Sequence, residues 1–453
     1  MSQKRIGFQL MYDIHSPSGS TATLDDRDMR RKPIAVDLFA GAGGLSLGFR
    51  QAGFDLCAAL EYDPIHCATH EFNFPECATI CRSVTEADGD HIREQSRIGD
   101  AEIAVVVGGA PCQGFSLIGK RALDDPRNQL VRHFLRLVEE LEPRYFVFEN
   151  VKGLTIGHHR RFLHEIIEEF KRRGYSIVEP YRVLNAMWYG VPQDRQRLFL
   201  LGARKGLPTP AYPPSTHQPD QSIGDLGGLP FTPTVWEAIG DLPEAEDYDE
   251  LLERDWVYAK FGRPGEYAKA LLDPRVPART GLRLLSSSLR TIHTSESQKR
   301  FAATAHGSVE PISRFLKLNP DAYCNTLRAG TASDRGAFTS PRPIHPITPR
   351  CITVREAARL HSYPDWFRFH ATKWHGFRQI GNSVPPRLAR AVALEIASVL
   401  HAPKVNGSAP EITGPQLGNT SLLTLNMSEA AGRYGVAADI VPRRKRDREP
   451  VYA

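Results

Sequence analysis

The segment from Ile34 to Arg204 alternates apolar runs with amphipathic stretches, and this alternation constrains the fold more than any other feature of the chain. The apolar runs are IAVDLF, LCAALE, EIAVVVGGA, YFVFENV and RLFLLGA, and their continuous hydrophobicity is typical of strands that are buried on both faces. Between them lie LSLGFRQAG, QLVRHFLRLVEEL and HRRFLHEIIEEFKRRG, which have the helical period. The alternation therefore predicts an α/β fold around a mostly parallel sheet.

The rest of the sequence divides the chain into further segments. The pattern is lost after residue 204, where proline and glycine become frequent, and helical periodicity returns in TVREAARLHSYP and PPRLARAVALEIASVL. We see no internal repeat. The expected segments are a flexible N-terminal part (1–32), the first part of the main domain (33–204), a loop-rich domain (205–345), late helices that return to the main domain (346–402) and a disordered basic tail (403–453).

The composition is that of a soluble globular protein, because 41% of the residues are hydrophobic and 24% are charged. No apolar run is long enough to span a bilayer, and the first residues lack the apolar core of a signal peptide. We therefore expect a cytoplasmic protein with no membrane partner. The net charge of +5 permits a nucleic-acid partner without requiring one.

The seven cysteines do not form a regular framework, and their odd number is typical of reduced thiols in a cytosolic chain. A zinc site is conceivable in HCATHEFNFPECATIC, which runs from His66 to Cys81. This stretch has no CxxC pair, the spacing that most structural zinc sites use. We therefore expect no metal.

The stretch VDLFAGAGGLSLGF reads as strand, glycine loop and helix, an arrangement that lets the backbone approach a ligand at a helix N-terminus. Ser46 occupies the place of the third glycine of GxGxxG, so a nicotinamide dinucleotide is disfavoured. Glu61 ends the second apolar run, where a carboxylate can accept hydrogen bonds from both ribose hydroxyls. Together these features indicate a cofactor that contains adenosine.

Cys112 follows the third apolar run, in the loop PCQGFS. Pro111 stiffens this loop and Gly114 lets it turn, so the thiol would lie at the sheet edge where open α/β folds bind ligands. A thiol is the most nucleophilic side chain near neutral pH. A cysteine taken alone is more often a packed thiol, so the identification of Cys112 as a nucleophile depends on the motifs that follow.

Two further motifs carry groups that suit acid–base chemistry and anion binding. Glu149 ends the fourth apolar run, where burial could keep its carboxyl protonated at neutral pH. Gln193, Arg195 and Arg197 alternate at the entry of the fifth run, which predicts that all three share one face. Two guanidiniums on one face suit phosphate or carbonyl oxygens, and a salt-bridged strand entry is the plainer interpretation.

The loop-rich domain is uneven in charge. Residues 236–255 carry nine acidic side chains and one basic side chain, whereas residues 286–350 carry nine basic and four acidic ones. If nucleic acid binds to this domain, the second stretch is the better candidate. A solvated face is the alternative for either charge run.

The motifs taken in order resemble the signature blocks of the cytosine-C5 DNA methyltransferases. The blocks are DLFAGAGGLSLGF, PCQGFS, ENV, QDRQR, REAARLHSYPD and QIGNSVPP, and the resemblance covers about residues 33–204 and 326–400. It implies a Rossmann-like, S-adenosylmethionine-dependent methyltransferase fold with a smaller, loop-rich target-recognition domain at 205–345. Residues 33–204 and 346–402 would then form one discontinuous catalytic domain.

The resemblance also implies catalytic roles. Cys112 would attack C6 of a cytosine that has left the duplex stack, and C5 would then take the methyl group of S-adenosylmethionine. Glu149 would protonate or hydrogen-bond N3 of that cytosine. Arg197 would hold the O2 edge, with Arg195 near it and near the target phosphate.

The same resemblance assigns the cofactor site to residues scattered along the chain. Glu61 would bind the ribose, Leu130 would contact the adenine, and the block around Asn382 would reach the methionine end. The implied cofactor-binding residues are Phe39, Ala42, Gly43, Gly44, Leu45, Glu61, Pro111, Leu130, Asn382, Ser383 and Val384.

One position departs from the family pattern. The family usually has an acidic residue after the third strand, where it binds the adenine amino group, but the aligned residue here is Ser83. A hydroxyl accepts this bond more weakly than a carboxylate, so cofactor affinity is the property in question. Asp88 or Asp90 takes this role if the alignment shifts.

Three other functions are compatible with parts of the sequence. An RNA cytosine-C5 methyltransferase uses the same chemistry, but most such enzymes have a cysteine in the later strand-end motif, which is ENV here. A catalytically inactive binding module is disfavoured because Cys112, Glu149 and Arg197 are all present. A nicotinamide oxidoreductase has no use for PCQGFS, and methyltransferases that act on exocyclic nitrogens need an Asp/Asn-Pro-Pro-aromatic loop in its place.

These expectations define the partners. We expect a monomer that binds double-stranded DNA and S-adenosylmethionine and needs no metal. A cognate restriction endonuclease is a possible partner of such a modification enzyme. The DNA sequence that it recognises cannot be derived from residues 205–345.

Overall fold

The computed structural model describes residues 32–111, 128–157, 159–219, 227–275, 281–330, 342–400 and 415–438. Contacts divide the chain into two units, Met1–Lys32 and Pro33–Ala453, and every helix and strand described below belongs to the second unit. Within the described residues, no helix is both long enough and apolar enough to cross a membrane.

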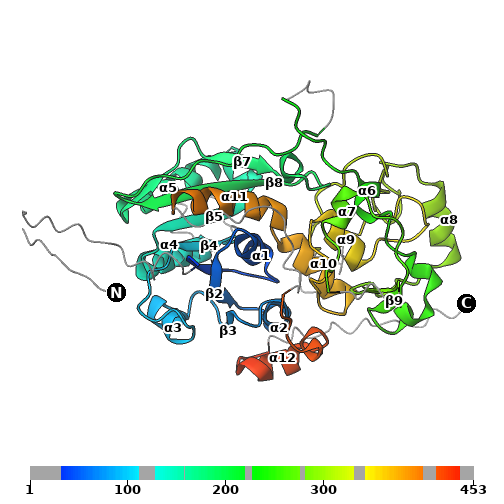
Figure 1. Ribbon diagram of the computed structural model, residues 1–453, viewed down its shortest axis with the longest axis horizontal. Coiled ribbons are helices and arrows are strands. Elements are labelled where there is room, and N and C mark those ends of the chain that lie inside the picture. The colour runs from blue at the N-terminus through cyan, green and yellow to red at the C-terminus, as the bar shows by residue number, and fades with distance from the viewer. Residues whose placement is uncertain are drawn as a thin grey trace, which may run out of the picture. The chain divides into compact units, whose positions relative to one another are not determined.

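A mixed sheet organises the first half of the second unit, and Figure 1 shows it in blue to green. Its strand order is β3-β2-β1-β4-β5-β8-β6, and β7 pairs with β8. β1 to β5 are parallel to their neighbours, whereas β8 runs antiparallel to β5, β6 and β7. The strands are β1 (Ile34–Leu38), β2 (Asp55–Glu61), β3 (Ala78–Cys81), β4 (Val105–Gly108), β5 (Tyr145–Val151), β6 (Tyr175–Ile177), β7 (Arg182–Asn185) and β8 (Gln196–Arg204).

The central strands are buried on both faces, which explains their continuous hydrophobicity. Val105 and Val147 belong to one core cluster, while their neighbours Val106 and Phe146 belong to a second one. Successive side chains of a strand point to opposite faces, so the two clusters cover the two faces of the sheet. The expected α/β fold with a mostly parallel sheet is therefore confirmed.

Helices cover both faces. α1 (Gly44–Gln51) and α11 (Pro386–Val399) share the first cluster, whereas α4 (Gln129–Leu141) and α5 (His159–Arg172) share the second. α1 and α11 are in direct contact, because a Cβ on Gly48 would collide with the Cβ of Ala389. Two further helices, α2 (Pro64–Asn73) and α3 (Gly89–Glu94), follow β2 and β3. Helices from both ends of the sequence thus complete one layer.

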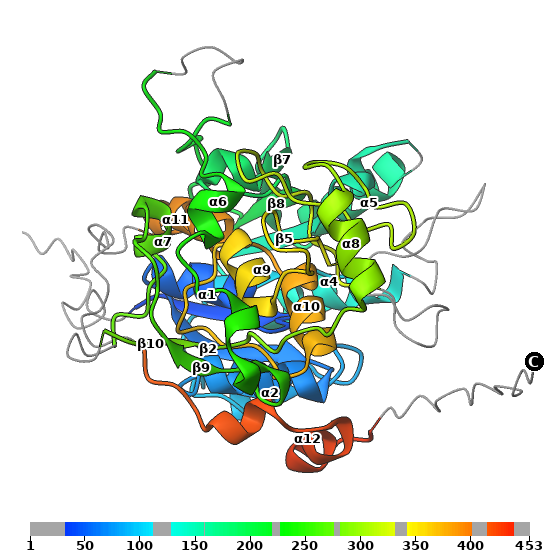
Figure 2. The ribbon, with the colours of Figure 1, turned by 90° about the vertical axis from the view of Figure 1, so that its right-hand side faces the viewer.

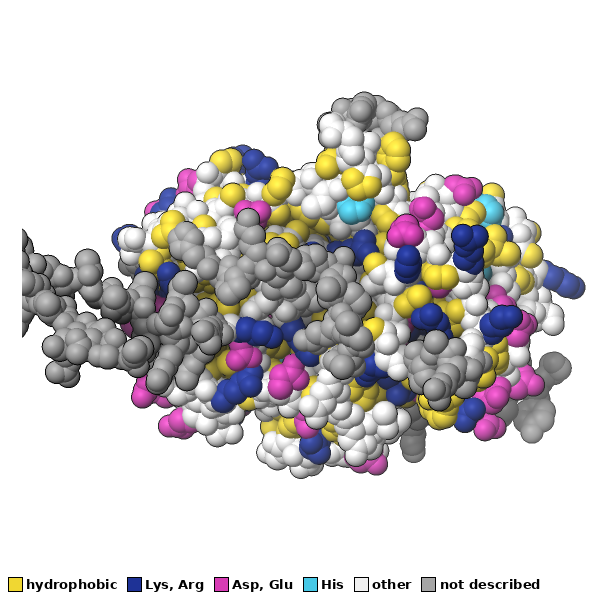
Figure 3. Space-filling view, viewed as in Figure 1, with side chains coloured by type: hydrophobic (Ala, Val, Ile, Leu, Met, Phe, Trp, Pro, Cys, Tyr) yellow, Lys and Arg dark blue, Asp and Glu magenta, His cyan; other side chains and the backbone are white. Residues whose placement is uncertain are grey.

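The region after β8 contains short elements joined by loops, shown in green and yellow in Figure 2. It has a small core of its own, made by Ala245, Leu251, Val257, Ala259 and Leu285. Where side chains are described in Figure 3, basic and acidic groups are interspersed over this region. The elements are α6 (Val235–Ile239), η7 (Ala245–Asp247), η8 (Asp249–Leu252), β9 (Val257–Ala259), α7 (Glu266–Lys269), β10 (Arg283–Leu285), α8 (Ser295–Ala303), α9 (Val354–Leu360) and α10 (Lys373–Asn382).

Two buried ion-pair networks connect α9 to the loops of this region. Arg359 is fully buried and donates to Asp241 at 3.0 Å and to Asp365 at 2.6 Å. Arg350 donates to Glu356 at 2.7 Å and to Glu244 at 2.6 Å. Because a buried charge is stable only when it is paired, these networks fix the loops that the region uses in place of regular structure.

The expectation of disorder over 403–453 is wrong for residues 415–438, which are ordered against α2. They form η10 (Thr420–Leu423) and α12 (Met427–Tyr434), and Leu422 and Leu423 pack on Phe72. The Tyr434 hydroxyl donates to Glu71 at 2.7 Å. The apolar residues of this segment are too few to show periodicity. The capping box of α12 is the signal in the sequence that indicates a helix here.

Candidate active site

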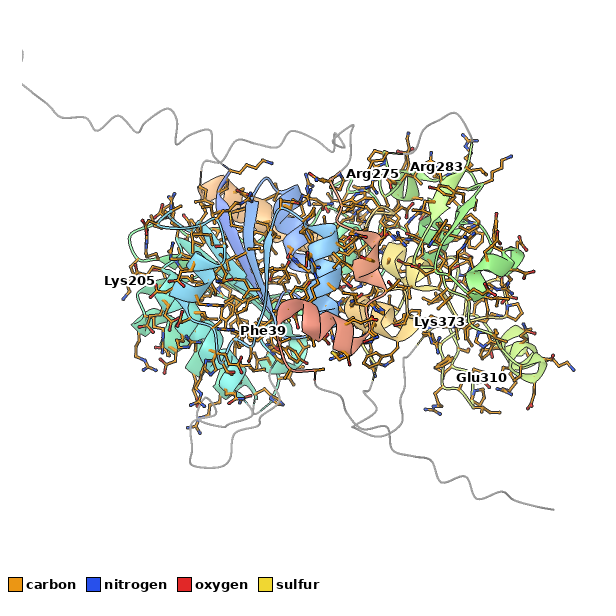
Figure 4. All side chains as sticks on the ribbon, turned by 90° about the horizontal axis from the view of Figure 1, so that it is seen from below. Phe39, Lys205, Arg275, Arg283, Glu310 and Lys373 are labelled. Atoms are coloured by element: carbon orange, nitrogen blue, oxygen red, sulfur yellow. The ribbon has the colours of Figure 1, made fainter. Side chains whose placement is uncertain are left out.

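The carboxyl ends of the parallel strands meet at one edge of the sheet, and most of the candidate residues lie there. The glycine loop follows β1, Glu61 ends β2, Gly109 to Pro111 follow β4, and Glu149 lies near the end of β5. Figure 4 labels Phe39 at this edge, on the lower side of the view. Ligands of open α/β sheets bind outside this edge.

The glycine loop has a backbone that few residues tolerate. Gly41 and Gly43 have positive φ angles of 57° and 103°, and Phe39, which is not a glycine, has a φ of 62°. A Cβ at Gly41 would meet no atom within 4 Å, so this part of the loop is open. Gly44 differs, because a Cβ there would collide with the carbonyl oxygen of Val384. The loop therefore faces open space at Gly41, and at Gly44 it contacts the segment 382–384, called the late block below.

Glu61 is buried and holds the loop in place. Its carboxylate accepts hydrogen bonds from the amide of Gly41 at 2.9 Å and from the amide of Asp63 at 3.0 Å. Each oxygen keeps further acceptor capacity, which suits a ligand hydroxyl. Tyr62, which sequence reasoning missed, lies next to it with a relative exposure of 59%. The signal in the sequence is an aromatic residue directly after the acidic residue that ends β2.

Ser83 is half-buried two residues after β3, whose last residue, Cys81, pairs with Glu61. Its hydroxyl accepts a hydrogen bond from the amide of Thr85 at 3.2 Å. Of the two alternative acids, Asp88 accepts from the amide of His91 at 2.8 Å and thereby caps α3. Ser83 thus lies at the same edge as Glu61, whereas the carboxylate of Asp88 is engaged in a helix cap.

The other cofactor candidates lie on several elements. Phe39 and Leu130 are partly buried against the same core cluster. Ala42 and Leu45 are buried within and just after the glycine loop. The late block begins with Asn382, which is exposed at the end of α10, and continues with Ser383 and the buried Val384. Pro111 is exposed, and Cys112 lies outside the described residues.

Glu149 and Arg197 form an ion pair at this edge. Arg197 Nε is 2.9 Å from Glu149 Oε1. In the antiparallel pairing of β5 and β8, Arg197 is opposite Val151, and Glu149 lies two residues away on the same face. Burial raises the pKa of the Glu149 carboxyl, and the charges of Arg197 and Arg195 oppose this shift. The pair therefore combines a carboxyl that tends to keep its proton with a guanidinium beside it.

The end of β5 also positions the loop that leads to Cys112. A Cβ on Gly109 would be 2.5 Å from Glu149 Oε2, so only glycine leaves room for this carboxyl. Asn150 donates from its side-chain amide to the carbonyl of Ala110 at 2.9 Å. The ENV motif therefore fixes the backbone two residues before Cys112.

Arg195 lies just before β8 and is held by backbone carbonyls of distant segments. It is fully buried, and its guanidinium donates to the carbonyls of Leu327 at 2.8 Å, Gly381 at 2.7 Å and Ser383 at 2.8 Å. Burial raises the pKa of the Glu149 carboxyl, and the charge of Arg195, like that of Arg197, lowers it. Arg195 connects the start of β8 to the late block.

Gln193 has a similar role. Its side chain accepts from the amide of Leu327 at 3.1 Å and donates to the carbonyl of Leu360 at 3.2 Å. Gln193 and Arg195 thus both fix Leu327, and Arg195 also fixes the carbonyl of Ser383. Of the three alternating residues, Arg197 is the one that the structure places beside Glu149.

Comparison with known proteins identifies the family. The profile of the C-5 cytosine-specific DNA methylase family matches residues 34–398. This chain belongs to that family. It is 60% identical to the Type II methyltransferase M.XorII of Xanthomonas oryzae pv. oryzae, over 92% of this chain and 95% of the relative. The Type II methyltransferase M.AgeI of Thalassovita gelatinovora is 31% identical, over 79% of this chain and 97% of that protein.

Solved structures agree with the family assignment. A crystal structure of a DNA modification methyltransferase encoded within an E. coli prophage is 33% identical, covers 82% of this chain and 100% of its own, and gives a TM-score of 0.65. The DNMT2 structure of Spodoptera frugiperda, 17% identical with a TM-score of 0.50 over 82% of this chain and 100% of its own, shares the fold. The protein is therefore a DNA (cytosine-5-)-methyltransferase with a Rossmann-like methyltransferase fold.

This family member has a buried polar chain behind the glycine loop, which sequence reasoning missed. The Ser46 hydroxyl donates to Asp37 Oδ2 at 2.6 Å and lies 3.0 Å from His70 Nε2. The other ring nitrogen of His70 lies 3.0 Å from the hydroxyl of Thr79. Burial raises the pKa of Asp37 to about 7 and lowers that of His70 to about 3. Ser46, which stands where GxGxxG has its third glycine, therefore links β1 to α2.

The cysteines that the structure describes are all buried and none forms a disulfide. Cys57, Cys67, Cys77, Cys81, Cys324 and Cys351 are buried and free. Within the described part of the chain, no three His, Cys, Asp or Glu side chains are arranged to bind a metal.

Proposed function

We propose that this methyltransferase modifies C5 of a cytosine in a specific short duplex sequence through a covalent bond between Cys112 and C6. The observation that carries this proposal is the Glu149–Arg197 pair, which lies over Gly109 at the end of the strand that leads to Cys112. A buried carboxyl and a guanidinium at this place suit N3 and O2 of one pyrimidine ring, which present an acceptor each.

The reaction would proceed through addition, methyl transfer and elimination. The Cys112 thiolate adds to C6, and the electron pair of the C5–C6 bond becomes available at C5 while the Glu149 carboxyl supplies a proton or hydrogen bond to N3. Bound S-adenosylmethionine would supply an electrophilic methyl group; C5 bonds to this carbon as its bond to sulfur breaks, and S-adenosylhomocysteine is the leaving group. A base then removes the C5 proton, the double bond forms again, and Cys112 leaves as a thiolate.

The residues present fit S-adenosylmethionine. Space is open above Gly41, the Glu61 carboxylate has acceptor capacity beyond its two amide partners, and an exposed aromatic ring lies beside it. The family assignment implies the same methyl donor. Glu61 would bind the ribose, and Tyr62 and Leu130 would contact the adenine. The full set is Phe39, Ala42, Gly43, Gly44, Leu45, Glu61, Ser83, Pro111, Leu130, Asn382, Ser383 and Val384.

The catalytic group would therefore be Cys112, Glu149 and Arg197, while Arg195 is a positioning residue. Arg195 connects Leu327 to the backbone at Ser383, so it holds the late block against the start of β8. It has no free access to a phosphate in this arrangement, because its side chain is fully buried.

The cytosine would leave the duplex stack to reach Cys112, since a base inside a duplex cannot be attacked at C6. Residues 205–345 would recognise the target, with 33–204 and 346–402 forming the catalytic domain. The Type II names of relatives support a role as a cytoplasmic modification enzyme beside a restriction endonuclease. We expect a monomer, because one active site modifies one flipped base.

The proposal is tested by expressing the protein in a bacterial host without cytosine methylation and sequencing the bisulfite-treated genome. We expect protected cytosines within one short motif, and no protection with Cys112→Ala. Protection that persists in Cys112→Ala would remove this residue from the chemistry. No protection with wild-type protein, together with methylation of RNA in the same cells, would overturn DNA as the substrate.

A further inference from the structure

A hairpin at residues 307–317 projects from the basic stretch of the loop-rich region. The amide of Gly307 donates to the carbonyl of Lys317 at 2.8 Å, and the amide of Lys317 donates to the carbonyl of Ser308 at 2.9 Å. Nearer the tip, the amide of Glu310 donates to the carbonyl of Phe315 at 2.8 Å. The turn itself is four residues long, Pro311 to Arg314.

The base of this hairpin is fixed to α8. The ammonium of Lys317, which is buried, donates to the carbonyls of Phe301 at 3.1 Å and Ala302 at 3.3 Å near the end of that helix. The Phe315 ring contacts the Phe301 ring, with centroids 6.5 Å apart. A buried cation on a helix C-terminus is a stable anchor, so the hairpin cannot shift without α8.

The turn is fixed by a buried acid. Glu310 is 1% exposed, and its carboxylate accepts from the amides of Ile312 at 3.2 Å and Ser313 at 2.6 Å. It also forms an ion pair with Arg300 of α8, whose Nε is 3.2 Å away. The carboxylate therefore determines the conformation of the turn, and α8 compensates its charge.

The side chains of Ile312 and Arg314 at the tip, in contrast, take no part in these contacts. Ile312 is 69% exposed. Arg314 is exposed, has a φ of 62°, and no side-chain partner is found for it among the described residues. Arg290, Arg300 and Arg342 in the same stretch all have partners. The amide of Arg314 donates to the carbonyl of Glu310 at 2.9 Å, which holds this backbone, so the exposed guanidinium extends from a fixed turn.

The hairpin lies on the side of the molecule that carries the glycine loop. Figure 4 places Glu310 and Phe39 on the lower side of the view, whereas Arg275 and Arg283 lie on the upper side. A duplex that presents a base to the sheet edge would therefore pass on the side where the hairpin projects.

We propose that the 307–317 hairpin determines sequence specificity by entering the major groove, where Arg314 pairs with a guanine of the recognised sequence and Ile312 contacts the neighbouring base edges. Arg bonds bidentately to O6 and N7 of guanine, and apolar side chains contact the methyl group of thymine. A fixed backbone lowers the entropy that such a contact costs. This inference rests on the proposed function, since it requires duplex DNA as substrate.

The test compares Arg314→Ala and Arg314→Lys with the wild type on the recognised duplex and on duplexes with one base pair changed. We expect Arg314→Ala to lower kcat/KM on the recognised duplex by about tenfold to a hundredfold and to abolish discrimination at one base pair. Arg314→Lys should not restore this discrimination, because an ammonium lacks the planar fork. Arg283→Ala, on the other side of the molecule, is the matched control and should behave as wild type.

Two results would overturn the inference. If Arg314→Ala lowers kcat/KM equally on every duplex and Arg314→Lys restores it, Arg314 contacts a phosphate. Unchanged kinetics of Arg314→Ala would show that the residue is not part of the DNA interface. Arg314→Asn, which tolerates the same backbone, shows whether any loss comes from a distorted turn. A wild type that methylates no duplex would overturn the proposed function as well, whereas an active wild type with an unaltered variant would overturn this inference alone.

Discussion

Glu149 Oε2 lies 2.5 Å from the position that a Cβ on Gly109 would occupy, so the carboxyl of one residue fills the space that the other leaves open. The two residues belong to neighbouring parts of the sheet edge, one near the end of β5 and one just after β4. The carboxyl that we propose as the proton donor to N3 therefore depends on Gly109 for its position, although Gly109 has no side chain of its own.

Gly109→Ala should lower methyl transfer strongly and leave folding nearly intact. The added methyl would displace the Glu149 carboxyl, and loss of a positioned general acid typically lowers a rate by about 10²-fold to 10⁴-fold. Single-turnover rates and binding of S-adenosylmethionine by calorimetry would be measured together. Gly265→Ala is the matched control, because a Cβ there meets no atom within 4 Å. A rate within twofold of wild type would mean that the carboxyl moves freely.

Arg195→Ala should mainly lower the free energy of unfolding, whereas Arg197→Ala should mainly lower the rate of methyl transfer. Without Arg195, the carbonyls of Leu327, Gly381 and Ser383 lose their buried donor, at about 1–3 kcal/mol for each unsatisfied group. Without Arg197, folding should change little while the rate falls. Urea denaturation and single-turnover rates on both variants would separate the two. Equal stability of the two variants would contradict the positioning role of Arg195.

Asp37→Asn should alter how stability depends on pH. The pKa of Asp37 is about 7 in the folded protein and near 3.8 when unfolded, so the folded state binds more protons between these values. Asp37 therefore makes the protein less stable as pH rises from 4 to 7, by up to about 4 kcal/mol. His70, with a folded pKa of about 3, has the opposite effect below pH 6.5.

Because the two effects oppose each other, the informative quantity is the difference between variant and wild type. Free energies of unfolding at pH 5 and pH 7 would be compared, and Asp37→Asn should gain stability relative to wild type as pH rises. A constant difference between the two proteins would show that Asp37 does not titrate in this range.

Ser83→Asp should tighten the binding of S-adenosylmethionine several-fold. A carboxylate accepts a hydrogen bond from an adenine amino group more strongly than a hydroxyl does, and Asp can keep the bond from the amide of Thr85. Calorimetric titration gives the affinity, and Ser83→Ala supplies the opposite change. If both variants bind the cofactor as wild type does, Ser83 does not contact the adenine.

The sequence predicts those parts of the fold that depend on local pattern. α4 occupies the residues of the stretch QLVRHFLRLVEEL, because its apolar face repeats without interruption. Glu61 and Glu149 were identifiable because parallel strands end at a common edge. The partners of Arg195 could not be predicted, because the carbonyls of Leu327, Gly381 and Ser383 lie more than 130 positions away in the sequence.

Long-range contacts account for what could not be predicted. Nothing in the sequence around Ser46 or His70 indicates that they form a hydrogen-bonded chain with Asp37, because β1, α1 and α2 meet only in the folded molecule. The order of residues 415–438 depends likewise on Phe72, about 350 positions earlier. Short segments whose partners lie far away have no periodicity to read.

The contact between α1 and α11 has a consequence for synthesis on the ribosome. The last strand of the sheet ends at Arg204, yet the helix that covers α1 begins at Pro386, about 180 residues later. At ordinary translation speed the apolar face beside α1 stays exposed to solvent for roughly 10 to 40 s. The layer that contains α1 is therefore completed only after residues 205–345 have been translated.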